Sequence, residues 1–580
     1  MQCYNRRKTD VVRVGDVKIG GENPIVLQSM TNTSTTDTAE SVAQIIRIVE
    51  AGGDMVRLTA QGPREAENLK NIKEECVKMG CNVPLVADIH FNPKVAEIAA
   101  LYVDKVRINP GNFIDPARTF KKLDYTDAEY AAEVSKIRER LLPLLDICRQ
   151  HHTAIRIGVN HGSLSDRIMN RYGDTPEGMM ESCMEFLRVC HDEHFDNVVI
   201  SIKASNPVVM VRTVRLLVEA MDKENMRYPL HLGVTEAGDG EDGRVKSAVG
   251  IGTLLAEGLG DTIRVSLSEA PEMEIPVARK LADYISSFAG VEFDGNECDL
   301  AVSDYSSDAV CGIGVDNKPV VIAEGEESVF PSPDFRLLGG NIVSVGKKAY
   351  PIVEDIENLK NDCFFSITLR KIRALSDAEK LNGKRFVFLL ETETANPVLE
   401  QRLFFAELRR RGCKNPVVLY RRYKENDVEM LQLKAAVDCG ALLIDGLADG
   451  VFVVNKGGIS SQLVNSTSFA VLQASHRRVT RTEYISCPGC GRTLYDLQEV
   501  IRQIKERTAR VSNLKIGIMG CIVNGPGEMA DADYGYVGAA RGKVSLYKKQ
   551  VCVEKNIDQA EAVDKLVELI KANGDWVENC

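Results

Sequence analysis

Eight short apolar runs recur through the first half of the chain, and each precedes a segment whose apolar positions follow helical spacing. The runs cover residues 25–27, 55–58, 85–89, 105–108, 154–159, 197–202, 230–234 and 262–267. Continuous rather than alternating apolar character indicates strands covered on both faces, as in a parallel sheet wrapped by helices. Helix-start signals at 36–40 and 268–272 agree with this rhythm. Eight β/α units within about 290 residues predict a TIM (β/α)8 barrel. A doubly wound open sheet is the alternative, because the number of strands does not show whether the sheet closes.

Polar and charged residues stand at the carboxyl end of each run, and in a TIM barrel these ends share one mouth. Cationic residues occupy equivalent positions on five runs: Arg57, Arg107, Arg156, Lys203 and Arg264. Any single one of them is explained equally well by a salt bridge to a neighbouring helix. Five like charges in one mouth repel one another unless an anion neutralises them. A guanidinium group can bind two oxygens of a phosphate through two parallel hydrogen bonds. The ring of cations therefore predicts a polyanionic, phosphate-bearing ligand.

Other polar residues of the first half carry weaker predictions. Asp88 and His90 follow a strand, and they either face the same mouth or form a structural hydrogen-bonded pair. The pair His151-His152 precedes a strand, so we expect it on the opposite face of the barrel and assign it no role. The charged segment 131–140 is interpreted as the solvated face of a helix.

Two cysteine turns near the end of the chain have the spacing of metal ligands. Cys487 and Cys490 stand on one tight turn, and Cys521 follows the apolar run 514–519, which predicts a buried strand. The helical spacing of apolar residues across 494–504 should pack that segment on the strand and bring the two turns together. Three soft ligands converging on one point suit either zinc or an iron–sulfur cluster.

The choice between these metals depends on the fourth ligand. A structural zinc ion takes four protein ligands, and neither turn offers a histidine or a fourth cysteine. Glu528 is anionic and lies on the same Gly/Pro-rich turn as Cys521. It is therefore the candidate weak ligand of a cluster that keeps one iron available for chemistry, while zinc stays the alternative.

The composition narrows the class of protein. A chain of 580 residues exceeds a single core, so two to four domains are expected. The 72 basic and 83 acidic residues give a net charge of −11, which argues against nucleic-acid binding, although a local arginine cluster can still bind an anion. No apolar run approaches the length of a membrane span, and no apolar run follows the basic N-terminus. Most of the 16 cysteines stand singly in apolar segments, as buried reduced thiols do. We expect a cytoplasmic protein without a secretory signal.

About 190 residues separate the first half from the cysteine turns, enough for a domain. Apolar runs at 385–390, 416–420, 441–444 and 451–454 predict strands, with helices through 403–411 and 430–437 between them. The segment 299–311 and the region of Gly339-Gly340 are expected to form short strands and loops. We find neither metal-ligand spacing nor a glycine-rich phosphate loop there. The insert is predicted to be a structural spacer, with a degenerate second barrel as the fold to test.

The residues after Cys521 predict a small α+β domain. Strands are expected at 534–537, 544–547 and 551–553, followed by a helix from 558 to about 572 that ends at Gly574. Cys552 falls in a strand and is interpreted as a core residue rather than a ligand. The predicted domains are 1–290, a substrate-binding barrel, 291–482, the insert, and 483–580, the cluster domain.

The cysteine turns also carry a resemblance to a known family. Cys-Pro-x-Cys at 487–490 followed by Gly-Cys-x-Val-Asn-Gly-Pro-Gly-Glu at 520–528 resembles the signature of 4-hydroxy-3-methylbut-2-enyl diphosphate synthase. The strand-end motifs match this family in order from about residue 7 to 271, and the match resumes at about 485. The resemblance implies an oxidoreductase of non-mevalonate isoprenoid biosynthesis, which opens 2-C-methyl-D-erythritol 2,4-cyclodiphosphate on a [4Fe–4S] cluster. It also implies a C-terminal module similar to that of sulfite and nitrite reductases, and a central insert as in the longer family members.

The resemblance assigns roles residue by residue. Substrate binding falls to Arg57, Arg107, Asn109, Arg156, Asn160, Lys203, Arg264 and Ser266. Catalysis falls to Glu236, Asn524 and Glu528, and the cluster ligands are Cys487, Cys490, Cys521 and Glu528. A flavodoxin or ferredoxin is implied as the electron donor.

Domain closure and two rival functions complete the predictions. Shorter family members are understood to close in trans, by a head-to-tail dimer. We predict that the insert replaces the second subunit, so that the cluster domain caps its own barrel, with a homodimer as the alternative.

One rival function is a zinc-stapled TIM-barrel transferase or binding protein for a phosphorylated ligand. The other is a non-catalytic iron–sulfur scaffold or sensor.

Overall fold

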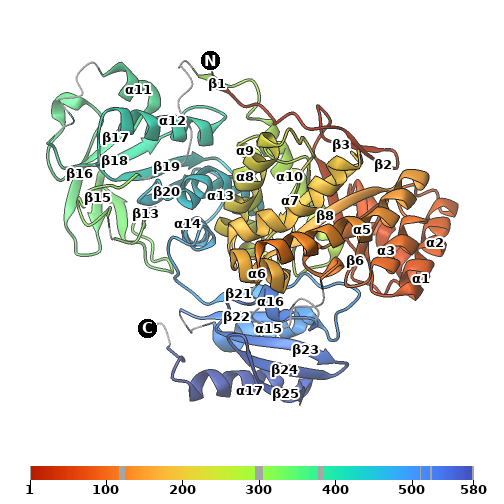
Figure 1. The fold of residues 1–580 in the computed structure, drawn as a ribbon. Coiled ribbons are helices and arrows are strands. Elements are labelled where there is room, and N and C mark those ends of the chain that lie inside the picture. Colours follow the sequence, from red (N-terminus) through yellow and green to blue (C-terminus); the bar gives the residue numbers. More distant parts are fainter. Residues whose placement is uncertain are drawn as a thin grey trace. The chain divides into compact units, whose positions relative to one another are not determined.

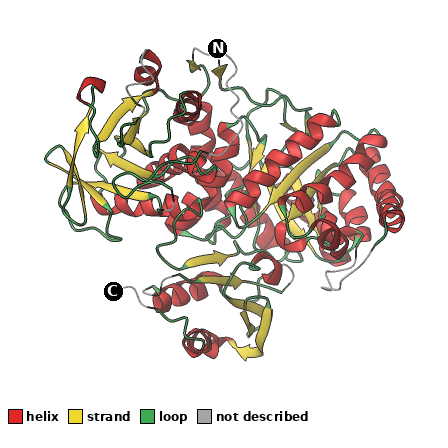
Figure 2. Ribbon diagram, turned by 60° about the vertical axis from the view of Figure 1, so that its left-hand side comes forward, coloured by secondary structure: helices red, strands yellow, loops and turns green. Residues whose placement is uncertain are grey.

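The computed structural model describes residues 2–115, 125–293, 305–315, 317–375, 381, 383–509, 511, 513–522 and 525–577. The chain forms two compact units, which are described separately (Figures 1 and 2). One unit holds Arg7–Gly243, Leu259–Arg279 and Arg481–Cys580, and the other holds Met1–Arg6, Arg244–Gly258 and Lys280–Thr480. This grouping differs from the predicted boundary at residue 290. None of the helices described is long and apolar enough to span a membrane.

The first unit contains eight parallel strands in the order β10-β11-β4-β5-β6-β7-β8-β9. They are β4 (Val26–Met30), β5 (Met55–Ala60), β6 (Leu85–Ile89), β7 (Lys105–Ile108), β8 (Ala154–Asn160), β9 (Val198–Lys203), β10 (His231–Leu232) and β11 (Thr262–Ile263). A parallel bridge between Ile200 and Leu230 joins β9 to β10, so the two edges of the sheet meet. The predicted TIM barrel is confirmed, and an open doubly wound sheet is wrong. Each predicted strand is present, although β10 and β11 are only two residues long.

Helices alternate with these strands along the chain (Figure 1). They are α1 (Thr38–Glu50), α2 (Pro63–Lys78), α3 (Pro93–Ala100), α4 (Pro110–Phe113), α5 (Asp127–His151), α6 (Asp166–Tyr172), α7 (Pro176–Asp192), α8 (Pro207–Lys223), α9 (Gly240–Ala256) and α10 (Glu274–Ser286). Asp37 caps α1 as predicted, its side chain accepting from the Glu40 N–H. The start predicted at 268–272 is early, because a 3-10 turn at Pro271–Met273 precedes α10.

The amino-terminal end of the barrel is closed by an apolar hairpin, β2 (Val12–Val14) and β3 (Val17–Ile19). Its valines and isoleucine pack in one core cluster with inward residues of the strands, namely Val12, Val14, Ile19, Val26, Met55, Val86, Ala154 and Val199. His151 and His152 are exposed at the end of α5, on this far side of the barrel. The opposite, carboxyl end is the one left with polar side chains.

The C-terminal module of the same unit is a five-stranded sheet in the order β21-β22-β23-β24-β25. The strands are β21 (Glu483–Ser486), β22 (Lys515–Met519), β23 (Tyr534–Ala540), β24 (Lys543–Lys548) and β25 (Val551–Asp558). The helices α15 (Leu497–Thr508) and α17 (Gln559–Ala572) pack on it through buried residues that include Ile504, Ile516 and Leu566. The predicted α+β arrangement is therefore present, and Cys552 is a partly buried core residue of β25.

The second unit contains a closed barrel of eight strands from the insert. They are β13 (Val320–Glu324), β14 (Phe335–Leu338), β15 (Asn341–Ser344), β16 (Ala349–Val353), β17 (Phe364–Thr368), β18 (Val387–Glu391), β19 (Val417–Tyr423) and β20 (Gly450–Asn455). The pairs β14–β15 and β15–β16 are antiparallel, and the Gly339-Gly340 turn joins the first of these pairs as predicted. The helices are α11 (Leu369–Ala374), α12 (Pro397–Arg410), α13 (Val428–Ile444) and α14 (Ser461–Ala474).

Two segments of the insert, 441–444 and 299–311, differ from the predicted strands or lie partly outside the described residues. The run 441–444 is not a strand but the last turn of α13, because a short apolar run is equally compatible with a buried helix. Of the segment 299–311, residues 299–304 lie outside the described residues, and in the remainder Val310 forms only an isolated bridge to Ile313. Within this unit the fully buried Asp438 accepts hydrogen bonds from Arg421, Tyr423 and Tyr284, which ties α10 to α13.

Candidate functional site

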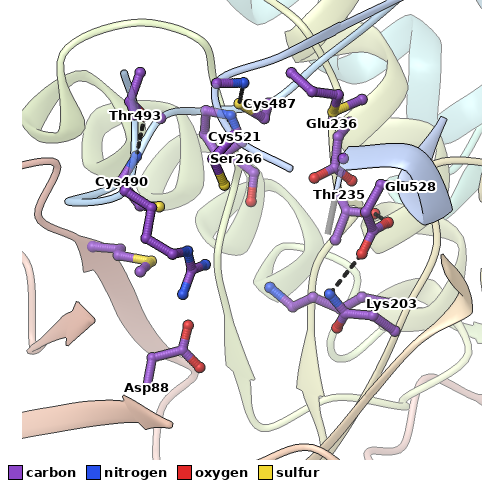
Figure 3. Close-up of a pocket in the computed structure, with 18 of the residues that line it drawn as sticks. Asp88, Lys203, Thr235, Glu236, Ser266, Cys487, Cys490, Thr493, Cys521 and Glu528 are labelled. Atoms are coloured by element: carbon purple, nitrogen blue, oxygen red, sulfur yellow. Dashed lines mark hydrogen bonds between the residues drawn. The ribbon is translucent and has the colours of Figure 1, made fainter. Parts of the chain in front are cut away.

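A single cavity of about 100 Å³ is lined by the barrel mouth and by both cysteine turns (Figure 3). The barrel contributes Met30, Arg57, Asp88, His90, Arg107, Arg156, Asn160, Lys203, Thr235, Glu236, Arg264 and Ser266, and the module contributes 487–490, Arg492, Thr493, 519–521, Gly525 and Glu528. The five predicted cations therefore lie together, on or directly after five strands of the barrel. They face the three cysteines, as the two separate patterns in the sequence required.

Arg156 and Lys203 are buried cations of this cavity. Arg156 is only 1% exposed, and its Nε and Nη1 atoms have no hydrogen-bond partner among the described residues. Burial, together with the neighbouring Arg57, lowers the pKa of both side chains well below their usual values. An unpaired buried cation is costly unless an anion compensates it. These two side chains therefore fit an anionic ligand better than a structural role.

Arg57 and Arg107 share the carboxylate of Asp88. Arg107 Nη1 donates to Asp88 Oδ1 at 2.9 Å, and Arg57 Nε lies 3.9 Å from Asp88 Oδ2. Burial alone would raise the pKa of Asp88, but Arg107 and Arg57 outweigh it and hold that pKa well below its usual value. His90 Nε2 lies 3.0 Å from Arg107 Nη1, and burial lowers the pKa of His90 to about 4. Asp88 and His90 thus line the mouth, where both contact Arg107, but His90 Nε2 lies 3.6 Å from Asp88 Oδ2, too far for a direct hydrogen bond between them.

Arg264 differs from the other cations because it has a carboxylate of its own. Its Nε and Nη2 atoms donate to the two oxygens of Glu274, each at 2.9 Å. Glu274 is 1% exposed and also accepts from the Ser29 hydroxyl at 2.7 Å. Arg264 lines the cavity, yet two of its three guanidinium nitrogens donate to Glu274 and so serve the fold.

The predicted neutral ligands separate into two groups. Asn160 and Ser266 line the cavity, and Asn160 accepts from Arg107 Nη2 at 3.1 Å. Asn109 does not line it: its amide donates to Ser163 Oγ at 2.8 Å, and its carbonyl oxygen caps α4 through the Gly111 N–H. The side chain of Asn109 thus shapes the loop after β7.

Glu236 and Glu528 come from different domains and lie side by side (Figure 3). Glu528 Oε1 accepts from the amide of Asn160 at 2.8 Å, and its Oε2 accepts from the Thr235 hydroxyl at 3.2 Å. Burial, with the nearby Glu528 carboxylate, raises the pKa of Glu236 well above its usual value. Glu236 also has a φ of +50°, a left-handed conformation that is uncommon for a non-glycine residue. A protonated Glu236 can therefore donate into the cavity.

The three cysteines lie along one side of the cavity (Figure 3). Cys487 Sγ accepts from the Gly520 N–H at 3.2 Å, which links the two turns, and burial raises the pKa of Cys487 to about 12. As the described side chains stand, no group of three or more His, Cys, Asp or Glu is close enough to hold a metal ion. The donor set nevertheless fits an iron–sulfur cluster, since three soft sulfurs and the hard carboxylate of Glu528 line the same cavity. Asn524 lies outside the described residues.

The module contacts the barrel mouth through backbone and charged groups. Ser486 forms a parallel bridge with Ala237, and Ser268 Oγ donates to the Cys487 carbonyl at 2.9 Å. Arg481 pairs with Asp242. A Cβ on Gly527 would lie 1.9 Å from the carbonyl oxygen of Gly162, so only glycine permits this approach of the two backbones. These contacts support the predicted closure of the module over its own barrel.

Two residues of the site were missed in the sequence. Arg492 follows Cys490 by two positions and points its guanidinium into the cavity, and Glu274 pairs with Arg264. The position of Arg492 on a cysteine turn was a usable signal, because a cation there must lie near the metal ligands. Glu274 gave no signal, since a glutamate in the first turn of a helix is ordinarily a solvated one.

Comparisons with known proteins cover both parts of this site. The family models described as "GcpE TIM-barrel domain" and "GcpE protein C-terminal domain" match residues 9–279 and 483–572. A protein of Phocaeicola vulgatus named 4-hydroxy-3-methylbut-2-en-1-yl diphosphate synthase (flavodoxin) is 56% identical over 99% of each chain. A protein of the same name from Bacteroides fragilis is 54% identical over 99% of this chain and 97% of its own. Among solved structures, the N-acetylneuraminic acid (sialic acid) synthetase of Leptospira borgpetersenii serovar Hardjo-bovis has a TM-score of 0.33 and 11% identity, covering 50% of this chain and 95% of that one. A score this low carries no argument.

Proposed function

Since the chain belongs to the GcpE family of 4-hydroxy-3-methylbut-2-en-1-yl diphosphate synthases, we propose that it catalyses the reaction of that name. The substrate is 2-C-methyl-D-erythritol 2,4-cyclodiphosphate. Two electrons open its ring and remove a hydroxyl, which takes up a proton and leaves as water, and the product is 4-hydroxy-3-methylbut-2-enyl diphosphate. The reaction belongs to non-mevalonate isoprenoid biosynthesis. The observation that carries the proposal is the single cavity that holds the cationic ring and the three cysteines.

The barrel residues bind and orient the substrate. Arg57, Arg107, Arg156, Lys203 and Arg264 neutralise the diphosphate, with Asn160 and Ser266 as neutral donors, all supported by their place in the cavity. The Nε and Nη1 atoms of Arg156 have no partner among the described residues, so each can donate to a phosphate oxygen. Asn109 acts indirectly, by fixing the loop beside Ser163. Fixing the diphosphate places the ring carbons beside the cysteine turns.

The module residues would hold the redox group, and Glu236 of the barrel supplies the acid. Cys487, Cys490, Cys521 and Glu528 would hold a [4Fe–4S] cluster, which supplies single electrons and a Lewis-acidic iron when bound. Burial and the nearby Glu528 raise the pKa of Glu236, which favours the protonated carboxyl that can donate a proton to the departing oxygen. Asn524 is assigned a supporting role on the same turn. The name of the Phocaeicola vulgatus relative includes flavodoxin, which supports flavodoxin as the electron donor.

We assign residues 1–290 to substrate binding, 291–482 to a spacer and 483–580 to the cluster domain. The fold of the cluster domain would resemble that of the sulfite and nitrite reductase module. The insert supports the spacer role through its own core: the inward residues of its barrel are apolar, including Ile322, Phe364, Leu389 and Phe452. An apolar interior has no counterpart of the cationic ring. The insert therefore offers no second phosphate basin among its described residues.

An anaerobic turnover assay tests the function. Purified protein should be brown, contain about four irons per chain, and convert the cyclic diphosphate when a reduced flavodoxin is supplied. Zinc in place of iron would favour the zinc-stapled transferase or binding protein. A cluster without turnover would favour the scaffold or sensor.

A mixing experiment tests closure in cis. The two variants are Cys487→Ser, which lacks a cluster ligand, and Arg156→Met, which lacks a phosphate-binding cation and is assayed at a substrate concentration too low to fill its weakened site. If the module caps its own barrel, the mixture stays inactive. Under closure in trans, reassorted dimers would recover about a quarter of wild-type activity, because half are mixed and each of those has one intact site. Recovery near that level would contradict the cis assignment and restore the homodimer.

A further inference from the structure

Arg492 is the only cation of the cavity that the module supplies, among the residues the structure describes. It lies on the turn that begins with Cys487, and its backbone is held against the barrel by the residue before it. A Cβ on Gly491 would stand 2.6 Å from the Thr33 carbonyl oxygen and 2.9 Å from Thr59 Oγ1. The turn therefore sits directly on the loop that follows β4 and on the end of β5, and the guanidinium of Arg492 lines the barrel mouth from the module side.

The hydrogen bonds of Arg492 are incomplete. Its guanidinium bonds Cys521, but its Nε and Nη1 atoms are buried and have no partner among the described residues. The nearest carboxylate, Asp88, is already held by Arg107 at 2.9 Å. Buried N–H groups of a charged side chain are rarely left without an acceptor, so a missing acceptor is expected there.

The charges around Arg492 indicate the kind of acceptor. Six cationic side chains line the cavity, Arg492 and the five of the barrel, against the three carboxylates Asp88, Glu236 and Glu528. Glu528 is engaged by Asn160 and Thr235, and Glu236 is a neighbour of Glu528 rather than of the arginines. On the Arg492 side of the cavity the compensating groups are the cysteines and Asp88, and Asp88 already serves Arg107 and Arg57. An anion that spans the module and the barrel would accept from the unpaired N–H groups of Arg492 and also neutralise the excess positive charge.

We propose that Arg492 binds a phosphate oxygen of the substrate, so that the diphosphate itself ties the cluster module to the barrel mouth. The nature of this anion rests on the proposed function. The five barrel cations bind the diphosphate in either position of the module, whereas Arg492 reaches it only when the module is closed. Substrate binding thereby favours closure, because the closed form makes one more charge-assisted contact than the open one.

Inorganic pyrophosphate is the probe, because it presents a diphosphate but has no carbon to reduce. Binding to the anaerobic holoenzyme is measured by calorimetry, and closure by hydrogen–deuterium exchange of peptides that cover 237–242 and 481–486, where module and barrel touch. The variants are Arg492→Gln and Arg492→Lys. Arg156→Gln is the matched barrel variant, and Arg502→Gln is the control, since Arg502 is an exposed arginine of the same module that pairs with Glu499 and Glu506.

In wild type and Arg502→Gln, pyrophosphate should slow exchange in both peptides. Arg492→Gln should bind about 10- to 100-fold more weakly and show no slowing even at saturation. Arg156→Gln should also bind weakly, yet recover full slowing once saturated, because its module keeps Arg492. Arg492→Lys keeps the charge beside the cysteines and should lie between Arg492→Gln and wild type. An unchanged visible absorption spectrum shows that each variant holds its cluster.

Three results would overturn the proposal: wild-type affinity in Arg492→Gln, full slowing of exchange in saturated Arg492→Gln, or no pyrophosphate binding by wild type. If Arg492→Gln fails to assemble a cluster, Arg492→Lys decides, and wild-type affinity in that variant is then the refuting result. Failure of the proposed function is distinguishable, because it would appear as an absence of turnover with the cyclic diphosphate while pyrophosphate still closes the module.

Discussion

Replacing Arg156 by methionine should leave the stability of the substrate-free barrel unchanged or raise it, whereas the same replacement of Arg264 should lower it. Both residues are buried arginines of the same ring, 1% and 3% exposed, so the same substitution removes a similar side chain from a similar depth. They differ in pairing. Arg156 has two N–H atoms without a partner, whereas Arg264 forms a bidentate pair with Glu274.

The magnitudes follow from this difference. Replacing a buried, poorly compensated charge by an apolar side chain of similar volume is neutral or stabilising by about 1–4 kcal/mol. Arg156→Met also relieves repulsion from Arg57 and Arg107, which lower the pKa of Arg156. Arg264→Met instead leaves Glu274 buried without its cation, which costs about 3–5 kcal/mol. Substrate affinity should fall in both, by roughly 10- to 100-fold for a lost charge-assisted contact.

Thermal unfolding of the substrate-free protein and calorimetry with the cyclic diphosphate check this prediction. One kcal/mol shifts the midpoint by roughly 2–4 °C in a domain of 150–250 residues. Arg156→Met should therefore unfold at the same temperature as wild type or several degrees higher, and Arg264→Met should unfold at least about 6 °C lower. Loss of stability in Arg156→Met comparable to that in Arg264→Met would refute the reasoning that Arg156 is reserved for an anion.

Three further predictions concern single residues. Glu528→Gln should still assemble a cluster on three thiolates, seen by visible absorption, but lose most turnover, and normal turnover would show that Glu528 is not a ligand. Burial lowers the pKa of His90 from 6.5 to about 4, so the neutral ring stabilises the fold above pH 6.5 and this contribution is lost as pH falls toward 4. Wild type should lose about 3 kcal/mol more than His90→Asn over that range in chemical denaturation, and parallel curves would contradict the burial of a neutral ring. In the insert, Asp438→Ala leaves the Arg421 guanidinium without its buried carboxylate and should destabilise that unit by about 3–5 kcal/mol, measured as a lower unfolding midpoint. A midpoint within a degree of wild type would show that the network adds no stability.

Local patterns in the sequence were sufficient for the elements and for the parts of the site that each element carries. A buried parallel strand needs a continuous apolar run, and a cysteine turn needs its spacing, so the eight strands and the turns at 487–490 and 521 were predictable one segment at a time. The ring of cations was predictable for the same reason, because the barrel repeats one position on successive strands. The limit of local pattern appears at 441–444, where four apolar residues end a helix instead of forming a strand.

The tertiary structure alone decided how those side chains pair. Arg264 and Arg156 hold equivalent positions in the sequence pattern. Arg264 is a structural cation because Glu274 of α10 packs against it, whereas Arg156 has unpaired nitrogens that can bind an anion. Asn109 caps α4, and its side-chain amide is held by the hydroxyl of Ser163, which lies 54 residues further along the chain. Arg492 joined the site because the module turn settles on the barrel mouth. Apolar periodicity is a property of one segment, whereas charge compensation depends on which distant segments meet, and that is fixed only when the whole chain has folded.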